Sequence, residues 1–154
     1  MSKSKANNKF RIPCSSMEEF YSLWIDFLTP IHKLTSKNKQ ILLAFLMLRY
    51  ELAQDITNEA LLDEVLMNED SKAKIKERCN LQGNYLQVAM FTLAQQNVLI
   101  KTLSDDTRKK YKYRINPRIL PDMQYNDTGV ILQFNFELKC NQNIHQNIEP
   151  TTEQ

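Results

Sequence analysis

Between residues 16 and 66, apolar side chains recur every three or four positions, a spacing that places them on one face of a helix. This pattern predicts three helices. The first begins at the capping box Ser16–Glu19 and ends near Pro30, and the other two span residues 35–54 and 57–66. The second helix is expected to be the longest and most apolar.

The segment from Ser71 to Ile100 has the pattern of two helices joined by a tight corner. Ile75 and Cys79 are four residues apart, as inward positions of a short helix would be, and Asn80-Leu81 forms the corner. A second helix follows from Gly83 to Gln96. The strands expected over residues 98–103 and 110–115, with a turn over 104–107, complete a winged helix-turn-helix with a small β-wing.

The helix from Gly83 to Gln96, in the recognition position, carries no charged residue. A helix that docks on DNA usually brings Lys or Arg to phosphates and guanines, so we expect this one to contact a protein instead. In the alternative, Phe91 packs inward and the helix binds no partner. An uncharged helix could still bind DNA, because Asn and Gln side chains can hydrogen-bond to base edges. The candidate partner-binding residues on this helix are Asn84, Gln87, Val88, Phe91 and Gln95.

Beyond residue 120, clean alternation of apolar and polar positions predicts one more strand, from Val130 to Leu138. Phe134 and Phe136 lie on its apolar face and are also candidate partner-binding residues. Such a strand needs a pairing partner, either the wing of its own chain or, as we favour, another subunit. The chain is thus divided into a basic N-terminal arm (1–15), a winged-helix domain (16–119) and a C-terminal extension with a strand and a polar tail (120–154).

The net charge of +2 hides a strong segregation of charge along the 154 residues. Residues 1–50 carry eight basic and three acidic side chains, whereas residues 51–70 carry seven acidic side chains and no basic one. The acidic run would repel phosphate or simply keep one helical face hydrated. The basic arm and wing are the candidate nucleic-acid-binding features, although an exposed ribbon can carry charges for solubility alone. Their residues are Lys3, Lys5, Lys9, Arg11, Arg108, Lys109, Lys110, Lys112 and Arg114.

The sequence contains no pattern of catalytic or ligand-binding residues that has a supporting context. With only two glycines, a phosphate-binding loop is excluded, and the three cysteines and two histidines show no metal-ligand spacing. We therefore expect no enzymatic activity, no cofactor and no metal. No apolar run is long enough to cross a bilayer and no secretory signal opens the chain, so no membrane partner is expected.

Residues 34–119 resemble the winged-helix domains of tailed bacteriophages, particularly crAss-like phages. The resemblance rests on the runs Lys74–Leu81, Tyr85-Leu86 and Asn97–Ile100, with Leu93 between them and Leu34-Thr35, Ile41-Leu42 and Leu62 upstream. Family members often have Gly where Asn80 stands, and Lys or Arg where this chain has Gln95-Gln96-Asn97.

The resemblance implies a structural or auxiliary component of a phage particle, located in the virion and bound to other protein subunits. The alternative is a DNA-binding transcriptional regulator in the cytoplasm that would use the wing and the N-terminal arm.

Overall fold

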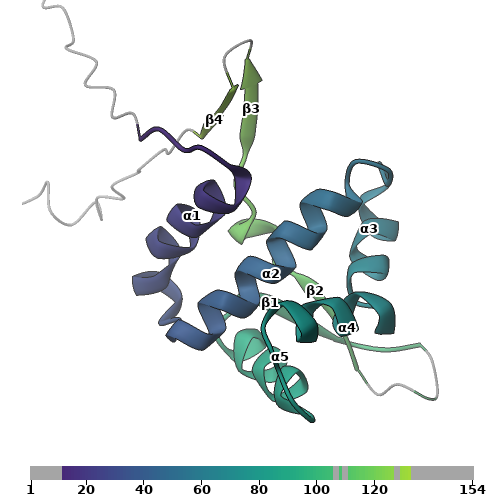
Figure 1. The fold of residues 1–154 in the computed structure, drawn as a ribbon. Helices are drawn as coiled ribbons and strands as arrows, with labels where there is room; N and C mark the ends of the chain where they lie inside the picture. Colours follow the sequence, from purple (N-terminus) through teal and green to yellow (C-terminus); the bar gives the residue numbers. More distant parts are fainter. Residues whose placement is uncertain (1–11, 106–107, 109–110, 127–128, 133–154) are drawn as a thin grey trace, which may run out of the picture. The chain divides into compact units, whose positions relative to one another are not determined.

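The computed structural model describes residues 12–105, 108, 111–126 and 129–132 (Figure 1). Within these ranges the chain is mainly helical with small antiparallel sheets, which confirms the expected fold class at this level. The helices are α1 (Met17–His32), α2 (Ser36–Leu52), α3 (Glu59–Leu66), α4 (Glu69–Arg78) and α5 (Tyr85–Gln95). The remaining elements are β1 (Leu99–Leu103), β2 (Tyr111–Ile115), the 3-10 turn Pro117–Ile119, β3 (Met123–Asn126) and β4 (Gly129–Leu132).

Side-chain caps fix the beginnings of the first four helices. Ser16, Thr35, Asn58 and Asn68 each accept a hydrogen bond from the backbone N–H three residues later, which satisfies a donor that the helix leaves open. Because Asn68 serves as a cap, α4 begins at Glu69, two residues before the expected start. Pro30 lies inside the last turn of α1 rather than ending it. Its missing N–H removes only one hydrogen bond of the helix, and the helix ends at the left-handed cap residue Lys33.

Three helices end in a left-handed residue that is not glycine. Lys33, Asn80 and Asn97 have φ angles of 56°, 51° and 60°. In each case the next residue is a buried Leu or Val whose N–H donates to the carbonyl five residues earlier, the geometry of a Schellman motif. The expected corner at Asn80 is therefore confirmed.

Helix α2 is the centre of the helical core and packs against α1, α3, α4 and α5 (Figure 1). Its fully buried residues include Ile41, Leu42 and Phe45, each with 0% of its surface exposed. Leu66 of α3, Ile75 of α4 and Leu93 of α5 complete the same core.

Strands β1 and β2 form an antiparallel hairpin whose register runs from Leu99 opposite Ile115 to Leu103 opposite Tyr111. Leu99 and Ile115 are buried, which anchors the base of the hairpin, whereas its outer end is exposed. Strand β1 starts one residue later than expected, at Leu99. Val98 belongs to the end of α5, because its N–H donates to the Leu93 carbonyl.

Residues 121–154 form a second unit, in which β3 and β4 pair as an antiparallel hairpin, Met123 opposite Leu132. The expectation that the strand beginning at Val130 pairs with the wing or with another subunit is wrong for its described part, residues 130–132, which pair with β3 as part of β4 (Gly129–Leu132). The polar stretch after Pro121 forms β3 and supplies the backbone partners, since closing a short loop costs the least entropy. Residues 133–138, with Phe134 and Phe136, lie outside the described residues.

None of the helices in the described part of the chain combines the length and the apolar character needed to cross a membrane.

Candidate interaction surface

Helix α5 exposes one uncharged face. Asn84, at its N-cap, and Gln87, Val88, Phe91 and Gln95 are all exposed, whereas Leu86, Ala89, Met90 and Leu93 are buried. The structure thus brings the five predicted residues onto one side of one helix. Val88 and Phe91 expose 56% and 46% of their surfaces, so the alternative in which Phe91 packs inward is wrong.

The apolar surface continues from α5 onto the β1–β2 hairpin through Lys101. Its Nζ lies 4.8 Å from the ring centre of Phe91 and 3.9 Å from that of Tyr111, which are cation–π contacts. Tyr111 in turn stands opposite Leu103, which is 74% exposed. We refer to the exposed residues Val88, Phe91, Leu103 and Tyr111, with Lys101 between them, as the α5–hairpin surface.

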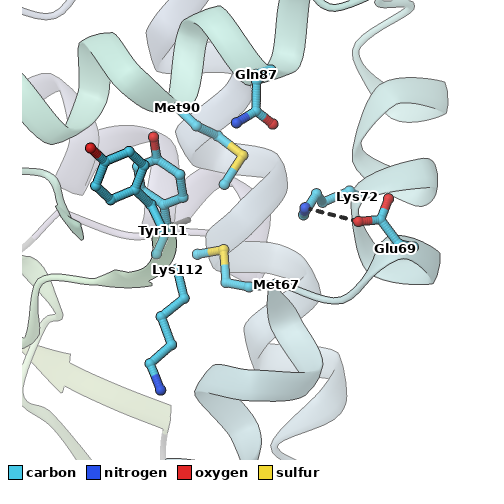
Figure 2. A pocket seen from close by; sticks show the side chains of 8 residues that line it. Met67, Glu69, Lys72, Gln87, Met90, Tyr111 and Lys112 are labelled. Carbon is cyan, nitrogen blue, oxygen red and sulfur yellow. Dashed lines mark hydrogen bonds and ion pairs between the residues drawn. The ribbon is translucent and has the colours of Figure 1, made fainter. Parts of the chain in front are cut away.

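A pocket of about 340 Å³ opens beside this surface, between the start of α4, α5 and β2 (Figure 2). Met90 and Gln87 project into it from α5 toward Met67, and Tyr111 closes it on the hairpin side. Tyr113 of β2 also lines it. Lys72 and Glu69 form an ion pair of 3.2 Å at its margin. Two flexible Met side chains and two Tyr rings make a lining that can adapt to an inserted apolar group.

The predicted basic residues are only partly brought together. Lys112 and Arg114 are exposed and, two residues apart on β2, lie on the hairpin face opposite to that of Lys101 and Tyr111. Arg108 is also exposed. Lys3, Lys5, Lys9, Arg11, Lys109 and Lys110 lie outside the described residues.

Arg114 acts on an acidic side chain of its own domain. Burial raises the pKa of Asp63 on α3, while the positive charges of Arg49 and Arg114 lower it and Glu59 raises it further. The charge of Arg114 on β2 thus acts on Asp63 within the same domain.

The described residues offer little other chemistry. No group of three His, Cys, Asp or Glu side chains among them could hold a metal ion. Burial raises the pKa of the Cys79 thiol, against the opposing charges of Lys37 and Arg78, so this thiol stays protonated at neutral pH. Its Sγ donates to the Gln40 carbonyl at 3.6 Å, a structural role.

The sequence pattern alone did not predict site residues at Lys101, Leu103, Tyr111 and Met67. The alternation within β1 and β2 places Lys101, Leu103 and Tyr111 on one hairpin face, so that signal was present in the sequence. Their approach to Phe91 depends on how the hairpin packs on α5, which no local pattern encodes.

Comparison of the chain with protein-family models, with curated proteins and with solved structures finds no match in any of the three.

Proposed function

We propose that this protein is a non-enzymatic interaction module, a winged helix-turn-helix whose α5–hairpin surface binds another protein subunit. In this proposal α4 and α5 are the helix pair and the β1–β2 hairpin is the wing. The observation that carries it is the exposed face of α5, which holds Val88 and Phe91 and no charge. Exposed apolar and aromatic side chains stabilise a complex when a protein partner removes them from water, whereas they add little to the binding of phosphate.

The adjoining pocket supports a protein partner. Interfaces gain most of their affinity where a large apolar side chain of one protein fills a desolvated pocket of the other. The pocket beside Tyr111 has room for such a side chain, and Gln87 and Lys72 at its wall can hydrogen-bond to the partner backbone.

We further propose that the partner is a subunit of a phage particle and that this chain is a structural or auxiliary component of it. This step rests on the resemblance of residues 34–119 to winged-helix domains of crAss-like phages.

DNA binding is the second candidate, favoured by the shared hairpin face of Lys112 and Arg114. We rank it lower because α5 brings no cation to a groove, and because Lys101 is already engaged by two rings.

The test is quantitative mass spectrometry of particles purified from cells infected by the phage that encodes the chain. We expect the chain in the particles, and an at least tenfold lower amount for Val88→Glu combined with Phe91→Glu, because each carboxylate would have to be buried without a partner. Both changes fall on exposed positions, so the thermal transition of the isolated protein should stay close to wild type.

The matched control adds the same two charges to exposed alanines of α3 and α4, Ala60→Glu with Ala73→Glu, and should be incorporated normally. Absence of the chain from particles contradicts the proposal. So does sub-micromolar DNA binding at physiological salt with a steep salt dependence, which would favour the DNA-binding alternative.

A further inference from the structure

Strand β2 has an edge without a neighbouring strand in the part of the chain that the structure describes, because its sheet consists of β1 and β2 alone. The Asn116 N–H donates to the Val98 carbonyl at 3.0 Å, and in an antiparallel pair such bonds recur at every second residue. The register then places Lys112 and Arg114 at hydrogen-bonded positions, whereas the backbone N–H and C=O of Tyr113 point away from β1. No described residue hydrogen-bonds to these two groups of Tyr113, so an added strand can pair with them.

The pocket beside Met67 and Met90 lies along this edge. Three consecutive residues of β2 line it, Tyr111, Lys112 and Tyr113. Successive side chains of a strand point to opposite faces, and Figure 2 shows the Lys112 side chain directed away from that of Tyr111. A cavity that all three residues line is therefore beside the edge of the strand rather than over one of its faces.

The size of the pocket favours an extended segment over a helix. A helix with its side chains is about 10–12 Å across and has a pitch of about 5.4 Å, so a single turn fills roughly 500 Å³. The pocket holds about 340 Å³. An extended segment that pairs with β2 at the usual strand spacing of about 4.8 Å can instead place one side chain in the pocket, between Met67 and Met90.

The two faces of β2 differ in chemistry. One face carries Tyr111 and Tyr113. The other carries Lys112 and Arg114. Arg114 already acts on Asp63, whereas Lys112 is exposed and forms no ion pair with any described residue. Cross-strand neighbours stabilise a sheet where aromatic groups meet apolar groups and where opposite charges meet, so a strand complementary to β2 alternates apolar and acidic residues.

We infer that the unpaired edge of β2 is a strand-addition site for an extended segment of the partner protein in which large apolar and acidic residues alternate. The apolar side chains contact the two tyrosines, one of them entering the pocket, and an acidic side chain faces Lys112. Backbone hydrogen bonds to Tyr113 supply affinity, and the alternation supplies specificity. This role rests on the proposed function of the α5–hairpin surface, since it specifies the segment that the partner presents beside it.

The experiment is a fluorescence-anisotropy titration of the full chain against a short labelled peptide that alternates leucine and glutamate. We expect saturable binding. A block peptide with all leucines before all glutamates, and a peptide that alternates leucine and lysine, should each bind at least about tenfold more weakly, because neither matches both faces of β2. Methylation of the backbone nitrogens of the leucine–glutamate peptide should abolish binding, since no N–H remains to pair with the strand.

A proline in β2 tests the backbone contact from the side of the protein. Tyr113→Pro removes the outward N–H without breaking a hydrogen bond to β1, so the hairpin should persist, as it does for prolines on edge strands. We expect at least about tenfold weaker peptide binding than for Tyr113→Val, which keeps the N–H. Leu103→Pro is the matched control, because the Leu103 N–H also points outward but from β1, so peptide binding should persist.

A charge reversal tests the acidic positions of the peptide. Lys112→Glu should weaken the binding of the leucine–glutamate peptide and strengthen that of the leucine–lysine peptide. Equal binding of the alternating and block peptides overturns the inference, as does undiminished binding to Tyr113→Pro. If Tyr113→Pro loses its thermal transition, the methylated peptide decides, and its binding as tightly as the parent peptide overturns the inference.

The proposed function can fail separately from strand addition. Incorporation into particles that depends on Val88 and Phe91, together with no binding of the leucine–glutamate peptide, overturns strand addition at β2 alone. Peptide binding by a chain that is absent from particles contradicts the particle role and supports strand addition.

Discussion

Asn80 is the residue at which the chain turns between α4 and α5, and it does so with a left-handed backbone (φ 51°). Most L-residues lose about 1–2 kcal/mol in this conformation, whereas the short polar side chain of Asn tolerates it. Leu81, the next residue, is only 8% exposed and its N–H donates to the Lys76 carbonyl at 2.9 Å. The conformation at Asn80 therefore turns the chain and also places Leu81 in the core.

Replacement of Asn80 tests this role. Asn80→Val should lower the free energy of unfolding by about 1–2 kcal/mol, because a β-branched side chain clashes with the backbone at positive φ. Asn80→Gly should leave it equal to wild type or higher. Urea denaturation measures both; equal loss in the two variants would show that the Asn side chain itself, not the backbone, is what stabilises the corner.

Asp63 makes stability depend on pH in a definite direction. Because burial raises its pKa in the folded state, the folded protein favours the protonated carboxyl. The protonated carboxyl therefore adds to the free energy of unfolding. This addition is fully present below about pH 3.9, the ordinary pKa of Asp, and is lost as the pH rises through the higher pKa of the folded state.

Asp63→Asn should therefore raise the free energy of unfolding at neutral pH, with the gain shrinking as the pH falls toward the ordinary Asp value. Denaturation at a series of pH values measures the difference from wild type. Asp55→Asn, at an exposed position, controls for the change in net charge. A gain that grows on acidification would contradict the assigned cause.

At the scale of the element, α5 has an exposed face that lacks the positive charges by which a helix usually contacts DNA. Gln87→Arg with Gln95→Lys should raise non-specific DNA affinity without loss of the thermal transition, because both side chains are exposed. Two added phosphate contacts would steepen the dependence of log K on log salt by about 1.8. Electrophoretic mobility shifts across salt concentrations measure this.

The control places the same charges away from α5, as Gln40→Arg with Gln54→Lys, both at exposed positions. If the control gains as much affinity, net charge alone is responsible and the α5 face has no special access to DNA.

The elements that the sequence predicted well are those specified by neighbouring residues. The starts of α2 and α3 follow from the side-chain caps Thr35 and Asn58, and the exposed face of α5 follows from its spacing. The extension of α1 past Pro30 was missed, because a proline in a last turn looks the same in sequence as a proline that ends a helix. The contact of Lys101 with Phe91 was missed because it depends on the packing of two elements.

At the scale of the whole molecule, acidic residues of the run 51–70 form ion pairs with basic residues from other segments of the chain. Glu51 and Glu59 of the acidic run pair with Arg78 and Arg49 at 2.7 and 2.6 Å. The run is therefore partly neutralised by basic residues before and after it, and its pairs are too exposed to add much stability. The charge segregation is visible in the sequence, but the partners in these ion pairs could not be predicted from it, because both pairs join different segments of the chain.

The hydrogen bond from Trp24 to Ile119 has a consequence for folding kinetics. Each described strand pairs with its immediate successor or predecessor in the chain, contacts that form quickly, whereas this bond joins residues 95 positions apart. Closing so long a loop is slow relative to local structure, so the contact between Trp24 and the segment after β2 should form last, after α1 has packed on the neighbouring α2. Trp24 is the only tryptophan in the chain, which makes its fluorescence a reporter of that final step, lagging behind the far-ultraviolet signal of the helices.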